Sequence, residues 1–370
     1  MNNVILPVNK KPLVIIAGPT AVGKTSVSIE FAKRVQGEII SADSMQVYRG
    51  MDIGSAKVTE KEMDGVPHHL IDILDPDEDF HVVKFQAMVK NAIKEIYGRG
   101  HVPVIAGGTG FYIQAVLYDI DYAETSGDPV YRAGLEQIAA EKGPAYLHDM
   151  LFMADPEAAA AIHPSNIKRT IRALEYFHLT GSPISKHNEE QRKKTSPYES
   201  YYFVLNRDRA KLYEQINRRV DEMMRGGLLD EVRGLKEKGF PKESTSMQGI
   251  GYKELYAFLD GECELSEAVE RIKLATRHFA KRQLTWFRRE KDVIWIDTEG
   301  KGKADIVDEM IDIINNKTSG DTAAAGGKIT VTANKTGEDI FASCGMKIRE
   351  ERAAKTAAAC GMDLSHGNDR

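Results

Sequence analysis

The chain has 370 residues, of which 42% are hydrophobic and 28% charged, an ordinary composition for a globular protein. This length is enough for one large domain and a second, smaller one. The net charge of −5 excludes a general attraction to nucleic acid, so any RNA-binding surface has to come from local clusters of cations.

Targeting and redox signals point to a cytoplasmic protein. Residues 1–11 lack the basic start and apolar run of a signal peptide, and no apolar stretch reaches the length of a membrane span. Cys263, Cys344 and Cys360 are too few and too scattered for a disulfide framework, and the last two lack the close pairing of zinc ligands. We therefore expect a cytoplasmic monomer without membrane contact.

Short apolar runs alternate with amphipathic segments over the first 121 residues. We predict strands at 13–17, 38–42, 69–72 and 102–106, and helices at 24–34 and 82–98. This alternation predicts an α/β fold, a parallel sheet wrapped by helices.

The pattern changes at about residue 122. Residues 122–198 are mostly helical, and strand character returns at 200–205 and 293–296, with helices at 209–238 and 266–289 between them. The sequence thus predicts a core built from residues 1–121 and 199–316 and interrupted by a helical insertion domain. The last segment, 317–370, is rich in Ala, Gly, Lys, Thr and Ser, which predicts a largely disordered tail.

A phosphate-binding loop follows the first predicted strand. Its residues fit the P-loop pattern one by one: Gly18, Pro19, Thr20, Ala21, Val22, Gly23, Lys24 and Thr25. Glycines let backbone N–H groups point inward, Lys24 supplies a full charge, and Thr25 supplies a hydroxyl for Mg²⁺. The alternative is a glycine-containing turn with an exposed lysine. The motif predicts phosphate binding and, with the strand and helix beside it, a fold of the P-loop NTPase and nucleoside-kinase type, without naming a reaction.

Two other strand ends carry candidate catalytic residues. Asp43 ends the second predicted strand, and Thr109 follows the strand at 102–106. Ligands of open α/β sheets bind at the carboxyl ends of strands, so Asp43 could act as a general base and Thr109 could bind a phosphate oxygen. The alternatives are that Asp43 caps the next helix and that Thr109 belongs to a simple turn.

Two predicted helices carry clusters of cations. The first contains Lys168, Arg169 and Arg172, and the second runs from residue 268 to 290 with seven Lys or Arg against two Glu. A single cluster is usually a solvated face, but two clusters in a chain with a phosphate-binding loop favour a polyanionic partner.

The motifs in chain order resemble those of the tRNA dimethylallyltransferase family of the bacterial type, from about residue 13 to 296. The matching segments are 18–25, 43–48, 51–57, 107–112, 162–164, 168–172, 248–253 and 281–288. Phe111 stands where leucine is common in the family. The 317–370 tail has no counterpart that we identify, and the zinc finger of eukaryotic relatives is absent from it.

The resemblance implies transfer of a dimethylallyl group from dimethylallyl diphosphate to the N6 amine of the adenosine next to the tRNA anticodon, with Mg²⁺ held by the diphosphate and Thr25. The P-loop would bind the diphosphate, and the catalytic residues would be Asp43, Thr109 and Arg132. The anticodon stem-loop would contact Asp43, Ser44, Met45, Gln46, Lys168, Arg169, Arg172, Gln248, Gly249, Ile250, Gly251, Tyr252, Lys253, Lys281, Arg282, Gln283, Trp286 and Arg288.

Three alternative functions share some of these features. A nucleoside or nucleotide kinase has the same fold and P-loop, and an isopentenyltransferase acting on free adenine nucleotides has the same chemistry without the need for basic helices. An RNA-binding nucleotide switch would need no chemistry at all.

Overall fold

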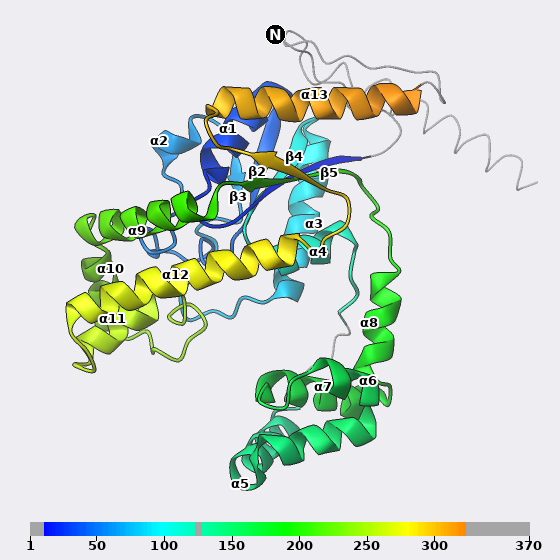
Figure 1. The fold of residues 1–370 in the computed structure, drawn as a ribbon, viewed down its shortest axis with the longest axis vertical. Coiled ribbons are helices and arrows are strands. Elements are labelled where there is room, and N and C mark those ends of the chain that lie inside the picture. Colours follow the sequence, from blue (N-terminus) through cyan, green and yellow to red (C-terminus); the bar gives the residue numbers. More distant parts are fainter. Residues whose placement is uncertain (1–10, 123–127, 323–370) are drawn as a thin grey trace, which may run out of the picture. The chain divides into compact units, whose positions relative to one another are not determined.

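The computed structural model describes residues 11–122 and 128–322. Six parallel strands form one sheet in the order β3-β2-β4-β1-β5-β6 (Figure 1). The strands are β1 (Pro12–Ala17), β2 (Gly37–Ala42), β3 (His68–His69), β4 (Val102–Gly107), β5 (Glu199–Asn206) and β6 (Val293–Asp297). The α/β fold with a parallel sheet that the sequence predicts is confirmed.

Helices connect the strands and cover the sheet. In the core these are α1 (Lys24–Val35), α2 (Glu60–Met63), α3 (Val82–Gly98), α4 (Gly110–Leu117), α9 (Arg209–Arg225), α10 (Leu228–Glu237), α11 (Tyr252–Leu259), α12 (Leu265–Phe287) and α13 (Lys303–Thr322). The segment between β4 and β5 also contains α5 (Pro129–Ala154), α6 (Pro156–Ala161), α7 (Ile167–Thr180) and α8 (Ile184–Arg192).

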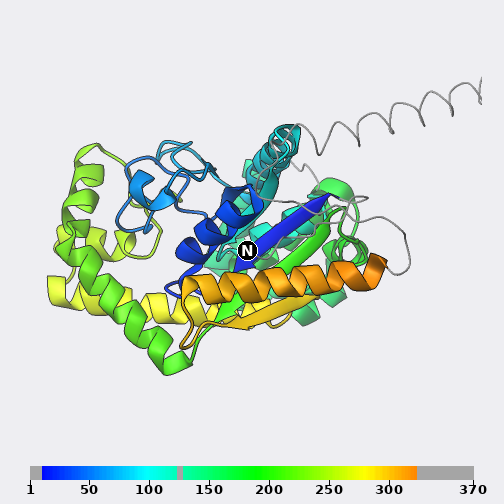
Figure 2. The ribbon, with the colours of Figure 1, turned by 90° about the horizontal axis from the view of Figure 1, so that it is seen from above.

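The side-chain alternation of the strands sorts the core into two layers. In β1, Val14 and Ile16 belong to the apolar cluster that contains the buried residues of α1 and α13. Leu13 and Ile15 are equally buried but lie outside that cluster, as the period of two in a strand requires. Figure 2 shows α13 lying across the sheet on one side. The central strands are therefore covered on both faces, which is why they read as continuous apolar runs.

Two predicted elements end at other residues in the structure than we expected. The strand predicted at 69–72 is only His68–His69, because Leu70 and Asp72 have φ of 63° and 53°, in the left-handed region that a strand cannot use. Helix α13 continues past residue 316, where we placed the start of the tail, and ends at Thr322. The rest of the predicted disordered tail, residues 323–370, lies outside the described residues, as do Cys344 and Cys360.

The chain forms two compact units, each described here by itself. One comprises Met1–Ile113 and Tyr198–Arg370, and the other comprises Gln114–Pro197. The second unit has its own apolar cluster, which includes Leu135, Leu147, Leu151 and Leu174. Within the described residues, no helix is both long enough and apolar enough to cross a membrane.

An ionic cluster ties together the segments that begin three strands. The Glu38 carboxylate, near the start of β2, is buried and bonds to Arg99 (Nε–Oε1, 2.8 Å), His69 (2.6 Å) and His101 (2.7 Å). Burial alone would raise the pKa of Glu38, but the hydrogen bonds from Arg99, His69 and His101 outweigh it and hold the pKa at about 2. Glu38 lies at the amino end of β2, Arg99 and His101 precede β4, and His69 is the last residue of β3.

This cluster predicts a loss of stability in acid. Because the pKa of Glu38 is lower in the folded chain than in the unfolded one, its contribution is complete above the unfolded pKa and disappears as the pH falls from about 4.5 to 2. Urea unfolding of the wild type across this range should show a drop larger by about 1–3 kcal/mol than that of Glu38→Gln. Identical pH profiles for the two proteins would contradict this role.

Candidate active site

The loop between β1 and α1 has the backbone geometry that a phosphate cradle requires. Gly18 has φ of 149° and Gly23 has φ of 101°, and a Cβ on Gly18 would lie 2.6 Å from the Leu205 carbonyl oxygen. Gly23 is the N-cap of α1 and has no side chain to occupy the free N–H groups of the first turn. These donors and the positive end of the helix are left for an anion.

Lys24 is the charged centre of the loop. Its Nζ donates to the Pro19 carbonyl oxygen at 2.8 Å. Burial lowers the pKa of Lys24 to about 8; the negative charge of Asp43 opposes this shift and the positive charge of Arg219 adds to it. The side chains of Asp43, Lys24 and Arg219 thus lie within electrostatic range of one another.

Strand register places the candidate residues at one edge of the sheet. Gly107 of β4 is paired with Ala17 of β1 on one side and with Ala42 of β2 on the other. Ala17 is followed by the P-loop, Gly107 by the Gly108–Thr109 turn, and Ala42 by Asp43. The Thr109 N–H donates to the Ala42 carbonyl oxygen at 3.3 Å. This bond joins the Gly108–Thr109 turn to the end of β2, next to Asp43.

A cavity of about 50 Å³ lies at this edge. Its walls include Lys24 and Thr25 of the P-loop, Asp43 and Gln46 beyond β2, and His68. Asp43 also accepts a bond from the Met45 N–H at 2.9 Å, so it caps the turn that follows β2 while it lines the cavity. The next helix, α2, begins only at Glu60, so Asp43 caps a turn and not a helix; its role as a general base stays a prediction.

Gln283 of α12 connects two sides of the site. Its Oε1 accepts from the Thr20 N–H at 2.9 Å, and its Nε2 donates to the Gly108 carbonyl oxygen at 3.0 Å. We predicted Gln283 as a tRNA contact, whereas the structure buries it between the P-loop and the end of β4. The signal was present in the sequence, since Gln283 is a polar residue on the apolar stripe formed by Ala280, Leu284 and Phe287.

Arg219 and Glu231 are further candidates that sequence reasoning missed. Arg219 lies next to Val220 on the half-buried side of α9, and burial lowers its pKa. The Glu231 carboxylate of α10 accepts from the N–H groups of residues 52–54 at 2.7–3.1 Å and from the Tyr252 hydroxyl at 2.7 Å. Glu231 therefore joins the 51–57 segment to the 248–253 segment. Neither contact has a local sequence signature.

The predicted tRNA contacts differ in exposure. Asp43, Ser44, Met45, Gln46, Arg172, Ile250 and Trp286 are partly buried, whereas Gly249, Gly251, Tyr252 and Gln283 are buried. The exposed ones are Lys168, Arg169, Gln248, Lys253, Lys281, Arg282 and Arg288. Their assignment to tRNA stays a prediction.

Arg132, the third predicted catalytic residue, belongs to the second unit. Its Nε donates to Glu175 Oε1 at 2.8 Å within that unit. This ion pair gives Arg132 a structural role, and its catalytic role stays a prediction.

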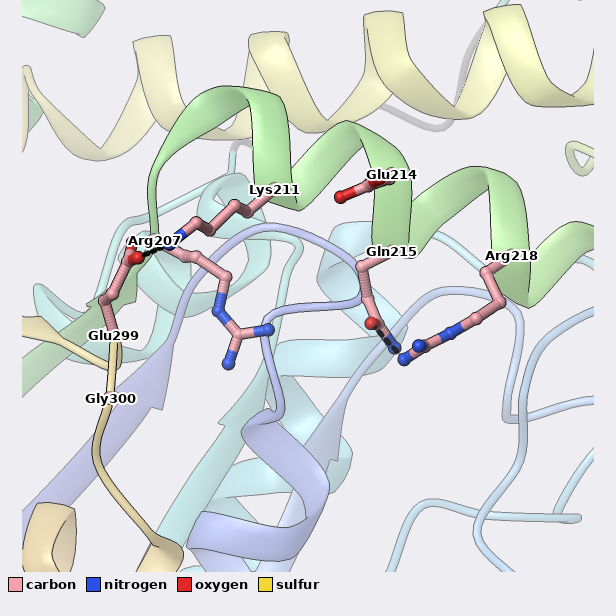
Figure 3. Close-up of a pocket in the computed structure, with 7 residues that line it drawn as sticks. All are labelled: Arg207, Lys211, Glu214, Gln215, Arg218, Glu299 and Gly300. Carbon is pink, nitrogen blue, oxygen red and sulfur yellow. Dashed lines mark hydrogen bonds and ion pairs between the residues drawn. The ribbon is translucent and has the colours of Figure 1, made fainter.

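A larger pocket of about 390 Å³ contains none of the predicted residues. Figure 3 shows its walls, which come from α9 and from the segments after β5 and β6, with Lys211 paired to Glu299 and Gln215 bonded to Arg218. Arg207 projects into it. The lining is polar and charged, so this pocket is poorly suited to a hydrocarbon group.

The described residues contain no cluster of three or more His, Cys, Asp or Glu side chains that could hold a metal ion. The Thr25 hydroxyl, at the start of α1, is of the oxygen type that Mg²⁺ prefers.

Together, the parallel sheet, the glycine-rich loop before α1 and the strand-end carboxylate define an α/β protein with a loop whose geometry suits an anion. Comparison with known families makes the class specific. A family model described as IPP transferase matches residues 46–290, and one described as isopentenyl transferase matches residues 11–75.

The chain belongs to the tRNA dimethylallyltransferase family. It is 61% identical over 308 residues to the tRNA dimethylallyltransferase of Lachnoclostridium phytofermentans, covering 83% of this chain and 98% of the relative. The Bacillus subtilis protein of the same name is 54% identical, and the aligned region covers 80% of this chain and 92% of that protein.

Solved structures agree with this assignment. The tRNA isopentenylpyrophosphate transferase of Bacillus halodurans is 46% identical with a TM-score of 0.66, and the match covers 86% of this chain and 100% of the other. A eukaryotic dimethylallyltransferase acting on tRNA is 26% identical with a TM-score of 0.72, and the match covers 94% and 98%.

The pKa of Lys24 predicts how phosphate affinity changes with pH. Because Lys24 loses its proton as the pH rises through about 8, the affinity for inorganic diphosphate should fall up to about tenfold per pH unit above that point. Calorimetric titrations from pH 7 to 10 would measure it, with Lys24→Met as the control that shares only the titration of diphosphate itself. A wild-type profile parallel to that of Lys24→Met would contradict the role of Lys24.

The Gln283 bridge predicts a local defect in the P-loop. Gln283→Leu leaves the Thr20 N–H and the Gly108 carbonyl without this partner, which should cost about 1–3 kcal/mol of unfolding free energy. Diphosphate affinity should fall as well, because the loop loses its connection to α12. Arg282→Leu, at the exposed neighbouring position, is the matched control; equal effects of the two changes would show that the bridge does not matter.

Proposed function

We propose that the chain transfers a dimethylallyl group from dimethylallyl diphosphate to the N6 amine of the adenosine 3′-adjacent to the tRNA anticodon. Family membership over most of the chain supports this reaction. The observation that carries it at the level of residues is the shared cavity of Lys24, Thr25 and Asp43. This cavity combines a cationic site for a leaving diphosphate with a carboxylate that can accept a proton.

The reaction needs both groups. The lone pair of an adenine amine is delocalised into the ring, so the amine is a weak nucleophile. An allylic carbon compensates, because it can bear developing positive charge as its bond to the diphosphate oxygen breaks. The amine nitrogen bonds to that carbon, the diphosphate leaves with the electron pair, and the surplus proton of the amine goes to the Asp43 carboxylate.

Negative charge grows on the diphosphate as it leaves. Lys24, the N–H groups of the P-loop and the first turn of α1 would stabilise this charge, usually a large contribution to catalysis. Thr109 would contact the diphosphate or the bound nucleotide from the adjacent strand end. Arg219, within electrostatic range of Lys24 and Asp43, would add a further positive charge.

The Thr25 hydroxyl would help to hold Mg²⁺ at the P-loop, where the ion would supply positive charge to the leaving diphosphate. The target base has to leave its stack to reach the site, and a base in an unpaired loop does so at least cost. This cost favours an anticodon loop over a helical stem. A cytoplasmic location and a monomeric state stay predictions from the sequence.

Mass analysis of tRNA tests the proposal. After incubation of the protein with unmodified tRNA, dimethylallyl diphosphate and Mg²⁺, the tRNA should gain one C₅H₈ unit on the adenosine next to the anticodon. An unchanged mass with a folded protein would contradict the proposal, and phosphoryl transfer from labelled ATP to nucleosides would replace it with the kinase function.

The role of Asp43 predicts a separation of rate from binding. Asp43→Ala should lower the turnover rate by roughly 10²-fold or more while tRNA affinity stays nearly unchanged, because the variant loses a proton acceptor. Single-turnover kinetics and filter binding of the same tRNA would measure the two effects, and Asp43→Asn would keep the shape of the side chain. If rate and binding fell together, Asp43 would be a docking residue.

A further inference from the structure

An aromatic pair lies beside the candidate site on the outside of the core. Phe111 is the second residue of α4 and is 42% exposed. Its ring meets the ring of Trp286, from the last turns of α12, edge to face at a centroid distance of 6.1 Å. In Figure 1 the carboxyl end of α12 lies beside α4, so residues far apart in the sequence form this pair.

Close packing of the residues next to the pair fixes the position of its rings. A Cβ on Gly110 would lie 2.2 Å from Trp286, so only glycine lets the indole pack against the start of α4. The neighbouring Tyr112 is buried and stacks on Phe85 at 4.7 Å. An exposed aromatic ring on such a support loses little freedom when another flat group stacks on it.

The pair is also close to the predicted chemistry. Thr109 lies two residues before Phe111, and its N–H bonds to Ala42, the residue before Asp43. Burial raises the pKa of Tyr112 to about 12, and the negative charge of Asp43 contributes to the shift. The hydroxyl of Tyr112, the residue after Phe111, is therefore within electrostatic range of the carboxylate that would receive the amine proton.

Four cations lie close to Trp286 in the sequence, within α12 and just after it. Lys281, Arg282, Arg288 and Arg289 are exposed, and Arg282 lies one helical turn before Trp286 on the same side of α12. Burial raises the pKa of the nearby Glu290 to about 7, which reduces its negative charge at neutral pH. Exposed aromatic rings flanked by cations are typical of sites where unpaired bases stack and phosphates are neutralised.

We propose that Phe111, packed edge to face against Trp286, forms a stacking shelf for one unpaired anticodon-loop base next to the target adenosine. The proposal rests on the proposed function and adds a contact to it. When the adenosine leaves its stack to reach Asp43, its neighbour loses a stacking partner. The shelf replaces that partner and so lowers the cost of extruding the target base.

Tryptophan fluorescence tests the contact directly. Trp286 and Trp295 are the two tryptophans of the chain, and Trp295 lies on β6, so Trp295→Phe leaves Trp286 as the reporter. Titration with an anticodon stem-loop RNA should change the Trp286 emission in this background. Phe111→Ala should weaken RNA binding about 5- to 150-fold, the range for one stacked base, without changing the KM for dimethylallyl diphosphate.

A double-mutant cycle identifies the stacked base. Stem-loops with an abasic site on the 5′ or the 3′ side of the target adenosine are bound to the wild type and to Phe111→Ala. At one of these positions the abasic site should weaken binding to the wild type and add little to the defect of Phe111→Ala. Equal losses in both proteins at both positions, or no loss in the wild type, would overturn the proposal.

The controls separate this proposal from the reaction itself. Phe111→Tyr should keep the affinity, and Leu274→Ala removes a similarly exposed apolar side chain (47%) from α12, the helix of Trp286, and should change nothing. Failure of the proposed function would look different, because tRNA would then stay unmodified by the wild type, whatever its affinity.

Discussion

The candidate site depends on the register of three parallel strands. Ala17, Gly107 and Ala42 lie side by side in β1, β4 and β2, so the P-loop, Thr109 and Asp43 all emerge at one edge of the sheet. A Cβ on Gly107 would lie 2.3 Å from the Ala42 carbonyl oxygen, so the close approach of β4 and β2 requires glycine there. A shift of one residue in either pairing would separate the carboxylate from Lys24 and turn the side chains to the opposite face.

Long-range hydrogen bonds then fix the loops that leave this edge. Gln283 holds Thr20 and Gly108 from α12, and Glu231 holds residues 52–54 from α10. These contacts join segments that are far apart in the sequence. The bond from Gln283 to Gly108 is buried and is costly to break, because its donor and acceptor would lose their partners. Helices α10 and α12 thus position the loops at the same edge where the proposed chemistry takes place.

The sequence predicts the elements better than their contacts. The strands β1, β2, β4, β5 and β6 were recognisable because apolar runs between turn residues are a local signal, and the P-loop was recognisable from its own pattern. The order of the strands in the sheet and the partners of Gln283, Glu231 and Arg219 are set by packing between distant segments, which no local pattern encodes. The short β3 was misjudged for a similar reason, since the left-handed backbone of Leu70 is not evident from an apolar run.

The central claim is that the P-loop holds a departing diphosphate while Asp43 faces the incoming amine. A crystal structure with an unreactive thio-analogue of dimethylallyl diphosphate and an anticodon stem-loop measures this directly. The account predicts diphosphate oxygens about 3 Å from Lys24 Nζ and the loop N–H groups, with the N6 amine of the extruded adenine within hydrogen-bond distance of the Asp43 carboxylate. A diphosphate bound elsewhere, or an adenine amine directed away from Asp43, would contradict it.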